Sequence, residues 1–145
     1  MSMQNYLRCQ IGQQWYGIAV SDVVEVLHFV ALTDMPGSPP HVLGLLTLRD
    51  MVIPVIDLRL LFDLPAAYRL DLPIIAVNTP DGPMGMVVDD VDDVVHIEQS
   101  SVYQNESNPY VQRASRLDDR LLLLLNLERL FVTSGYIGTN TPATT

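Results

Sequence analysis

The feature that most constrains the fold is an internal duplication. Residues 17–28 read GIAVSDVVEVLH, and residues 85–96, 68 positions later, read GMVVDDVDDVVH without a gap. Residues 48–62 (LRDMVIPVIDLRLLF) align with residues 117–131 (LDDRLLLLLNLERLF) at an offset of 69. Two matches in the same order, at nearly the same offset, indicate two related structural units within this chain of 145 residues.

Both units consist of short apolar segments separated by turn-forming residues. The pattern predicts a first strand at residues 6–11 and 72–78, and a second strand that includes residues 17–20 and 85–88. Asp81-Gly82 between two apolar runs favours a hairpin. No helical pattern exceeds about two turns, and proline and glycine recur throughout. The sequence therefore predicts an all-β fold with two pseudo-repeats, approximately 6–62 and 72–131, and a disordered tail at 132–145.

The end of each unit predicts a short capped helix. Asp57 and Asn126 directly precede leucine-rich turns, and both residue types accept backbone N–H groups at helix N-termini. We therefore predict that both are helix caps rather than catalytic groups. Arg59 is expected to be a solvated helix residue. Pro54 cannot donate to a sheet ladder, which predicts an edge position or a bulge.

Charge and composition exclude several classes of function. The formal net charge is −9, and all eight basic residues are arginine. This balance argues against nucleic acid and anionic membrane surfaces as partners. The single cysteine, Cys9, excludes an internal disulfide and is expected to be a buried, inert thiol. No apolar run is long enough for a membrane span, and the first eight residues lack the apolar core of a signal peptide, so a cytoplasmic location is expected.

No catalytic, cofactor or metal site is predicted. Residues 89–93 read DDVDD, but the carboxylates are interrupted by valine in a strand-to-turn segment, which favours a solvated acidic face over a calcium loop. Asp22 and Glu25 have the spacing of a capping box, which predicts one helical turn there. His28 and His96 recur at matched positions, which indicates a structural role. Neither a nucleophile elbow nor a phosphate-binding loop is present.

Specific function is expected where the two units differ. Arg49 stands where the second unit has Asp118, and Glu25 stands where it has Asp93. This asymmetry predicts a docking surface on the first unit. The predicted partner-binding residues are Val24, Glu25, Leu43, Gly44, Arg49 and Asp50. The alternative for Arg49 is an exposed ion pair, which would contribute only about 0–1 kcal/mol to stability.

These residues resemble the CheW-like domain family of bacterial chemotaxis over residues 6–131. That family combines a Y-G-I strand, a V-x-E-V turn, an L-R-G hairpin, a P-V-I-D-L-R segment and a G-x-V-V-D strand. The matching residues are Tyr16-Gly17-Ile18, Val23, Glu25, Val26, Gly44, Leu48-Arg49, Pro54 to Arg59 with Phe62, and Gly85 to Asp89. Two departures are Asp50, where the family usually has glycine, and Leu43, where charged or polar residues are common.

The resemblance implies two small SH3-like five-stranded β-barrels that share a core, with short helical turns. It also implies a non-enzymatic cytoplasmic adaptor that needs no cofactor. Such an adaptor would couple the cytoplasmic tips of methyl-accepting chemoreceptors to the regulatory domain of a CheA-type histidine kinase. By similarity, Glu25 and Arg49 would face the receptor, and Leu43 and Gly44 would lie near the kinase-facing end of one barrel.

Two other functions stay open at this point. The first is an accessory CheW-like scaffold of a non-flagellar chemosensory system, such as one that controls pilus motility. The Asp50 departure keeps this alternative in view. The second is a small-molecule sensor, which would need a pocket with a few convergent polar groups. The apolar residues expected in the interior disfavour the sensor.

Overall fold

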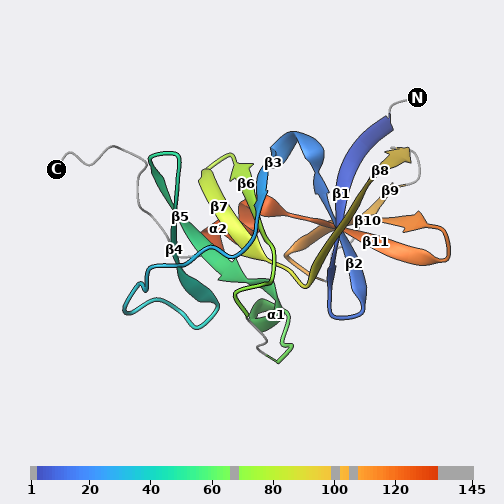
Figure 1. The fold of residues 1–145 in the computed structure, drawn as a ribbon. Helices are drawn as coiled ribbons and strands as arrows, with labels where there is room; N and C mark the ends of the chain where they lie inside the picture. Colours follow the sequence, from blue (N-terminus) through green and yellow to red (C-terminus); the bar gives the residue numbers. More distant parts are fainter. Residues whose placement is uncertain (1–2, 66–68, 99–101, 105–107, 134–145) are drawn as a thin grey trace.

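The computed structural model describes residues 3–65, 69–98, 102–104 and 108–133, and these residues form two curled β-sheets (Figure 1). The six-stranded sheet has the order β8-β1-β2-β11-β10-β9, and the five-stranded sheet has the order β3-β6-β7-β5-β4. The strands of the first sheet are β1 (Met3–Ile11), β2 (Gln14–Ala19), β8 (Asp90–Glu98), β9 (Val102–Gln104), β10 (Val111–Leu117) and β11 (Arg120–Leu125). Those of the second are β3 (Val23–Leu27), β4 (Val42–Leu48), β5 (Met51–Asp57), β6 (Ile74–Thr79) and β7 (Gly82–Val87).

Three short helical segments complete the fold. They are the 3₁₀ turn η1 (Val20–Asp22), α1 (Leu58–Leu61) and α2 (Leu127–Thr133). The predicted all-β fold with two barrel-like halves is confirmed, although one sheet has six strands because β9 pairs with β10. Helix α2 extends to Thr133, two residues into the range predicted as a tail. Residues 134–145 lie outside the described residues.

Each pseudo-repeat contributes strands to both sheets. The first repeat places β1 and β2 in the six-stranded sheet and β3, β4 and β5 in the five-stranded sheet. The second repeat places β6 and β7 in the five-stranded sheet and β8 to β11 in the other. The two repeats therefore interlock, and neither barrel-like half is built from one continuous stretch of sequence.

The duplication is preserved in the strand pairing. β11 pairs in parallel with β2, with Leu124 opposite Gly17, and β5 pairs in parallel with β7, with Val55 opposite Gly85. These positions are related by the same offsets of 68 and 69 that relate the two halves of the sequence. Parallel neighbours require a long connection. Here the chain between each pair of parallel strands runs through other elements of the two interlocked repeats.

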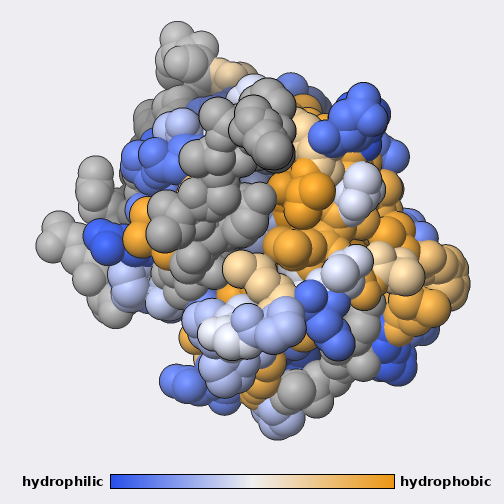
Figure 2. Space-filling model, turned by 90° about the vertical axis from the view of Figure 1, so that its left-hand side faces the viewer, coloured by the Kyte–Doolittle hydropathy of each residue, from blue (hydrophilic) through white to orange (hydrophobic). Residues whose placement is uncertain are grey.

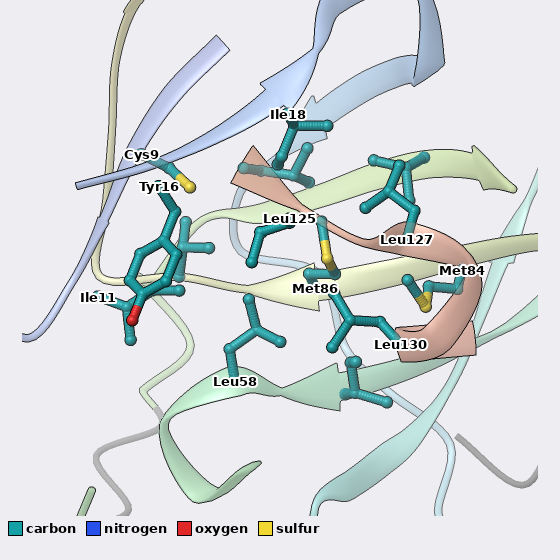
Figure 3. Close-up of a cluster of buried hydrophobic side chains, with 14 of the residues drawn as sticks. Cys9, Ile11, Tyr16, Ile18, Leu58, Met84, Met86, Leu125, Leu127 and Leu130 are labelled. Carbon is teal, nitrogen blue, oxygen red and sulfur yellow. The ribbon is translucent and has the colours of Figure 1, made fainter. Parts of the chain in front are cut away.

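A shared apolar core lies between the two sheets (Figure 3). Figure 3 shows Cys9 and Ile18 of the first repeat facing Met86 and Leu125 of the second. The buried members of this core are Cys9, Ile11, Tyr16, Ile18, Val42, Ile56, Leu58, Ile75, Val77, Met84, Met86, Val88, Val111, Leu125, Leu127, Leu130 and Phe131. Because both repeats supply this core, we expect the halves to depend on each other for stability.

Two local predictions are wrong. Pro54 lies in β5, which is an inner strand between β7 and β4. Proline is tolerated there because the pairing of β5 with β7 begins only at Val55, so no ladder bond from residue 54 to β7 is lost. The capping box is also absent. Asp22 ends η1 instead of beginning it, and Glu25 lies in β3.

Arginine makes several specific contacts in this fold. The guanidinium carbons of Arg8 and Arg120 lie 4.1 and 4.0 Å from the centre of a Trp15 ring. Arg8 also forms an ion pair of 2.9 Å with Asp92. Planar guanidinium groups stack on aromatic rings and pair with carboxylates at the same time, which an ammonium group does poorly. None of the helices among the described residues has the length and apolar character needed to cross a membrane.

Candidate docking surface

The charged centre of the predicted surface is an ion pair between β3 and the turn that follows β4. Nη2 of Arg49 lies 3.1 Å from Oε1 of Glu25, and the two side chains are 68% and 37% exposed. β3 and β4 are the two edges of the five-stranded sheet, so curling of the sheet brings them together. An ion pair this exposed adds little to stability. Its charged groups consequently stay available to a partner.

The turn that carries this arginine has an unusual backbone. Arg49 and Asp50 are the two central residues of the β4–β5 hairpin, and their φ angles are 49° and 70°. A two-residue hairpin with positive φ at both positions is a type I′ turn, which favours glycine at its second position. Asp50 therefore holds a backbone conformation that glycine adopts at lower cost.

Replacing Asp50 with glycine is expected to raise the free energy of unfolding by roughly 0.5–1 kcal/mol, because the left-handed backbone would no longer carry a Cβ. Chemical denaturation of both proteins would measure the change. The matched control is Asp119→Gly, since Asp119 follows Asp118 in the equivalent hairpin and has no positive φ. Glycine at residue 119 should lower stability by increasing the entropy of the unfolded chain. A loss at both positions would contradict the assignment of the turn.

Gly44 is held against a neighbouring backbone. Thr33 and Leu45 exchange two backbone hydrogen bonds of 2.8 and 2.7 Å across β4. A Cβ built on Gly44 would lie 2.6 Å from the carbonyl oxygen of Thr33, which is closer than such atoms approach. Gly44 is itself buried. The close approach of these two segments is reason enough for glycine at this position.

Val24 and Leu43 belong to an apolar rim around a second cluster of buried residues. The rim residues are half-buried and pack on that cluster; we define the apolar rim as Val24, Leu27, Val30, Leu32, Leu43, Leu48 and Met51. On the side of the molecule where β4 and β5 lie, Figure 2 shows apolar side chains gathered in one area. Two rim residues, Val24 and Leu48, directly precede Glu25 and Arg49 in the chain. The rim and the ion pair thus adjoin each other.

Phe29 is a residue of this region that the sequence analysis did not single out. Its side chain is 68% exposed, and its φ is 57°. An exposed aromatic residue with a left-handed backbone is unfavourable on both counts. It directly precedes Val30 of the rim. The duplication could have revealed it, because Phe29 follows His28 at the point where the second unit has Ile97, a buried residue.

Val20 and Val94 are two further exposed apolar residues. They are 37% and 46% exposed. Val94 lies opposite Leu7 in the pairing of β8 with β1, and Leu7 is a half-buried residue at the boundary of the shared core. The sequence analysis assigned residues 89–93 to a solvated acidic face and missed the exposed valine beside it.

Arg59 is not a solvated helix residue. Its Nη1 forms an ion pair with Oδ2 of Asp89, and the same oxygen accepts a hydrogen bond of 2.7 Å from the backbone N–H of Gly12. The Nε of Arg59 donates to the carbonyl oxygen of Pro65. The two side chains in the pair are only 20% and 26% exposed. This contact joins α1 to the β1–β2 turn and to the residue before β8, and it removes Asp89 from the predicted acidic face.

Both predicted helix caps accept a backbone N–H. Oδ1 of Asp57 accepts from the N–H of Arg59 at 2.9 Å, and Oδ1 of Asn126 accepts from the N–H of Arg129 at 3.1 Å. Asp57 is almost completely buried, and its Oδ2 has no hydrogen-bond partner among the described residues. Burial raises the pKa of Asp57 above its ordinary value of 3.8, while its backbone hydrogen bonds and Arg59 act in the opposite direction.

The other candidate residues show no catalytic arrangement. Burial raises the pKa of the Cys9 thiol from 9.0 to about 12, which keeps it protonated and unreactive near neutral pH. His28 is exposed, and Nδ1 of the exposed His96 contacts Oδ1 of Asn5. Within the part of the chain that the structure describes, no three His, Cys, Asp or Glu side chains gather closely enough to hold a metal ion.

Comparison with known proteins identifies the family of this chain. The family model described as "CheW-like domain" matches residues 5–134. The chain is 27% identical over 134 residues to the chemotaxis protein CheW of Klebsiella aerogenes, covering 88% of this chain and 81% of that protein. It is 29% identical over 118 residues to the CheW protein of Bacillus subtilis, covering 77% and 76%.

A solved structure is similar over nearly the whole described fold. The crystal structure of the scaffolding protein TtCheW from Thermoanaerobacter tengcongensis superposes with a TM-score of 0.80 and 26% sequence identity. The match covers 86% of this chain and 90% of that one. The similarity therefore includes both sheets and their interlocked arrangement.

Proposed function

Because the chain belongs to the CheW-like domain family, we propose that it is a non-enzymatic cytoplasmic adaptor of a chemosensory system. It couples the cytoplasmic tips of chemoreceptors to the regulatory domain of a CheA-type histidine kinase. The observation that carries this proposal is the pairing of two different surfaces on one half of the molecule. An exposed Glu25–Arg49 ion pair adjoins the apolar rim, which already has the composition of a docking site.

The apolar rim is the surface proposed for the kinase domain. Protein interfaces take most of their binding energy from a few apolar or aromatic anchors near the centre of the contact. Phe29 is the exposed aromatic residue beside the rim, and its unfavourable backbone is explained if binding to a partner is what retains it. Leu43 is itself a rim residue, and the next residue, Gly44, is buried. Leu43 packs on the buried cluster, and Gly44 admits the neighbouring backbone of Thr33.

The Glu25–Arg49 pair and Asp50 are proposed to face the chemoreceptor. Charged groups at the border of an interface govern the choice and orientation of the partner more than they add affinity. Three charges of both signs, on β3 and on the β4–β5 turn, would suit a helical hairpin whose surface also carries both signs. A carboxylate at residue 50, where the family usually has glycine, changes the local charge. That change is the reason to retain one alternative, an accessory scaffold for a receptor of a non-flagellar system.

Isothermal titration against the regulatory domain of a CheA-type kinase from the same cell would test the proposal. We expect micromolar binding by the wild type. Phe29→Asn should weaken it by at least about 10-fold, because an aromatic anchor is lost while asparagine suits the positive φ. Arg49→Ala should leave it within about 2-fold, since the charged pair faces the other partner.

The control for loss of exposed apolar surface is Leu121→Asn. Leu121 is 51% exposed and lies in β11 of the other sheet. It should bind the kinase domain like the wild type. Failure of the folded wild type to bind would overturn the coupling role. Equal losses in Phe29→Asn and Leu121→Asn would remove the rim as the docking surface.

A further inference from the structure

A polar hollow lies where α2 begins, at the junction between η1 and the end of β11. Its volume is about 240 Å³. The lining residues come from both repeats: Gln4, Tyr6, Ala19, Asp22, Pro80, Arg113, Leu124, Leu125, Asn126, Leu127 and Glu128. A second hollow adjoins it, sharing Asn126 and Glu128. Neither the apolar rim nor the Glu25–Arg49 pair contributes to this junction.

The duplication explains why this junction is open. The offset of 69 relates Glu128 to Arg59, and the offset of 68 relates Ser21 to Asp89 and Pro80 to Gly12. Beside α1, Arg59 of the first repeat binds Asp89 of the second, and Asp89 accepts the N–H of Gly12, so this junction is closed. At the equivalent positions beside α2, Glu128 supplies a negative group, Ser21 supplies no charge, and Pro80 has no N–H to donate. The contacts that close the first junction cannot form at the second.

The charges around the hollow are not balanced. Asp22 is half-buried and Glu128 is exposed, and neither carboxylate has a hydrogen-bond or ion-pair partner among the described residues. Arg113 is the opposing cation. Its Nη2 donates to the hydroxyl of Tyr6 at 3.4 Å, and its Nε is buried without a partner. Two carboxylates against one guanidinium leave a net charge of −1 at the hollow.

We propose that this hollow accepts a guanidinium or ammonium side chain from a protein partner. The incoming cation would lie between Asp22 and Glu128 and would pair with carboxylate oxygens, as Arg59 pairs with Asp89 beside α1. The volume suits one long side chain, since pockets for drug-sized ligands measure roughly 300–1,000 Å³. The inference rests on the proposed function only in taking the cation to belong to a partner protein. It adds a second contact whose lining residues are separate from those of the apolar rim.

The test is an NMR titration of the ¹⁵N-labelled chain with N-acetyl-arginine amide. This probe carries one guanidinium and uncharged ends. We expect saturable shifts at the backbone amides of Asp22, Asn126 and Glu128, with a dissociation constant on the order of 1 mM for so small a ligand. N-acetyl-citrulline amide has the same shape without the charge and should produce no saturable shift. Glu128→Gln and Asp22→Asn should each weaken binding by about 3- to 10-fold.

The matched control is Asp34→Asn, which removes an exposed carboxylate that does not line the hollow. It should bind the probe like the wild type. Unsaturable shifts, or equal binding of the citrulline probe, would overturn the proposal. N-acetyl-glutamate amide tests the opposite charge. If it gives saturable shifts centred on Arg113 and the arginine probe gives none, the hollow binds a carboxylate and the proposal is overturned.

The two proposals fail separately. If the chain binds the kinase domain but does not respond to the arginine probe, only the proposed cation site is overturned. If the chain does not bind the kinase domain but still binds the probe through Glu128, the cation site stands and the proposed coupling role is overturned.

Discussion

Replacing Leu58 with alanine is expected to lower the free energy of unfolding by about 2–5 kcal/mol, because it removes a fully buried side chain and leaves a cavity. Leu58 begins α1 and packs in the core that both repeats share. We therefore expect the loss of stability to lower the unfolding midpoint of both sheets and not only that of the five-stranded sheet. Urea denaturation followed by circular dichroism would measure it.

The single tryptophan makes the cooperative part of this prediction measurable. Trp15 lies in β2 of the six-stranded sheet, whereas α1 follows β5 of the five-stranded sheet. Its fluorescence and the circular dichroism signal should report the same midpoint in wild type and in Leu58→Ala. Leu127→Ala is the equivalent change in the second repeat and should behave alike. Leu121→Ala, at an exposed position, should cost under about 1 kcal/mol. Separate transitions for the two signals would show that the halves unfold independently.

The internal duplication predicted the parts of the fold, but not how they are connected in space. The matches at residues 17–28 and 85–96 identified equivalent strands, and their equivalent pairings are present in the structure. An offset between two segments does not say which sheet either one joins. The interlocking depends on β1 pairing with β8 and on β2 pairing with β11, more than 75 residues apart. Such pairings are decided by packing of the whole chain, which short-range patterns do not record.

The same limit explains which site residues were predicted. Glu25 and Arg49 were identified because the two repeats differ there, and the structure brings them together as an ion pair. Arg59 was misassigned because its partner, Asp89, is 30 residues away, and the helical pattern around residue 59 indicates only an exposed position. Phe29 was not identified because it lies directly after the matched segment, which ends at residue 28.

The use of arginine without lysine acquires a physical reason in this fold. The partly buried Arg8 combines an ion pair with a ring contact, and the partly buried Arg59 combines an ion pair with a hydrogen bond to a carbonyl oxygen. The exposed Arg120 combines a ring contact with a hydrogen bond to a carbonyl oxygen. A guanidinium presents five donors in a plane and is more weakly hydrated than an ammonium, so partial burial costs it less. Arginine thus joins the interlocked elements of a protein whose net charge is −9.

Asp57 gives the second large expected effect, and it depends on pH. Burial raises its pKa above 3.8, so the folded chain holds this proton more tightly than the unfolded chain does. The stability that this tighter proton binding contributes is fully present below pH 3.8. It is lost as the pH rises through the raised pKa of Asp57. Near neutral pH the carboxylate is buried with one oxygen unpartnered, which disfavours the folded state.

Asp57→Asn is expected to stabilise the protein by about 1–3 kcal/mol near neutral pH, because a neutral amide replaces the buried charge. Asparagine keeps the cap, as Asn126 does at the equivalent position of the second repeat. The gain should shrink as the pH falls through the raised pKa toward 3.8, because the wild-type carboxyl then becomes protonated in the folded chain. Urea denaturation of both proteins at about pH 7 and about pH 4 would measure it, and Asp57→Ala is the control. Alanine removes the cap along with the charge, so it should be less stable than Asp57→Asn at both pH values. A gain that did not depend on pH would mean that the burial of this carboxylate is not what limits stability.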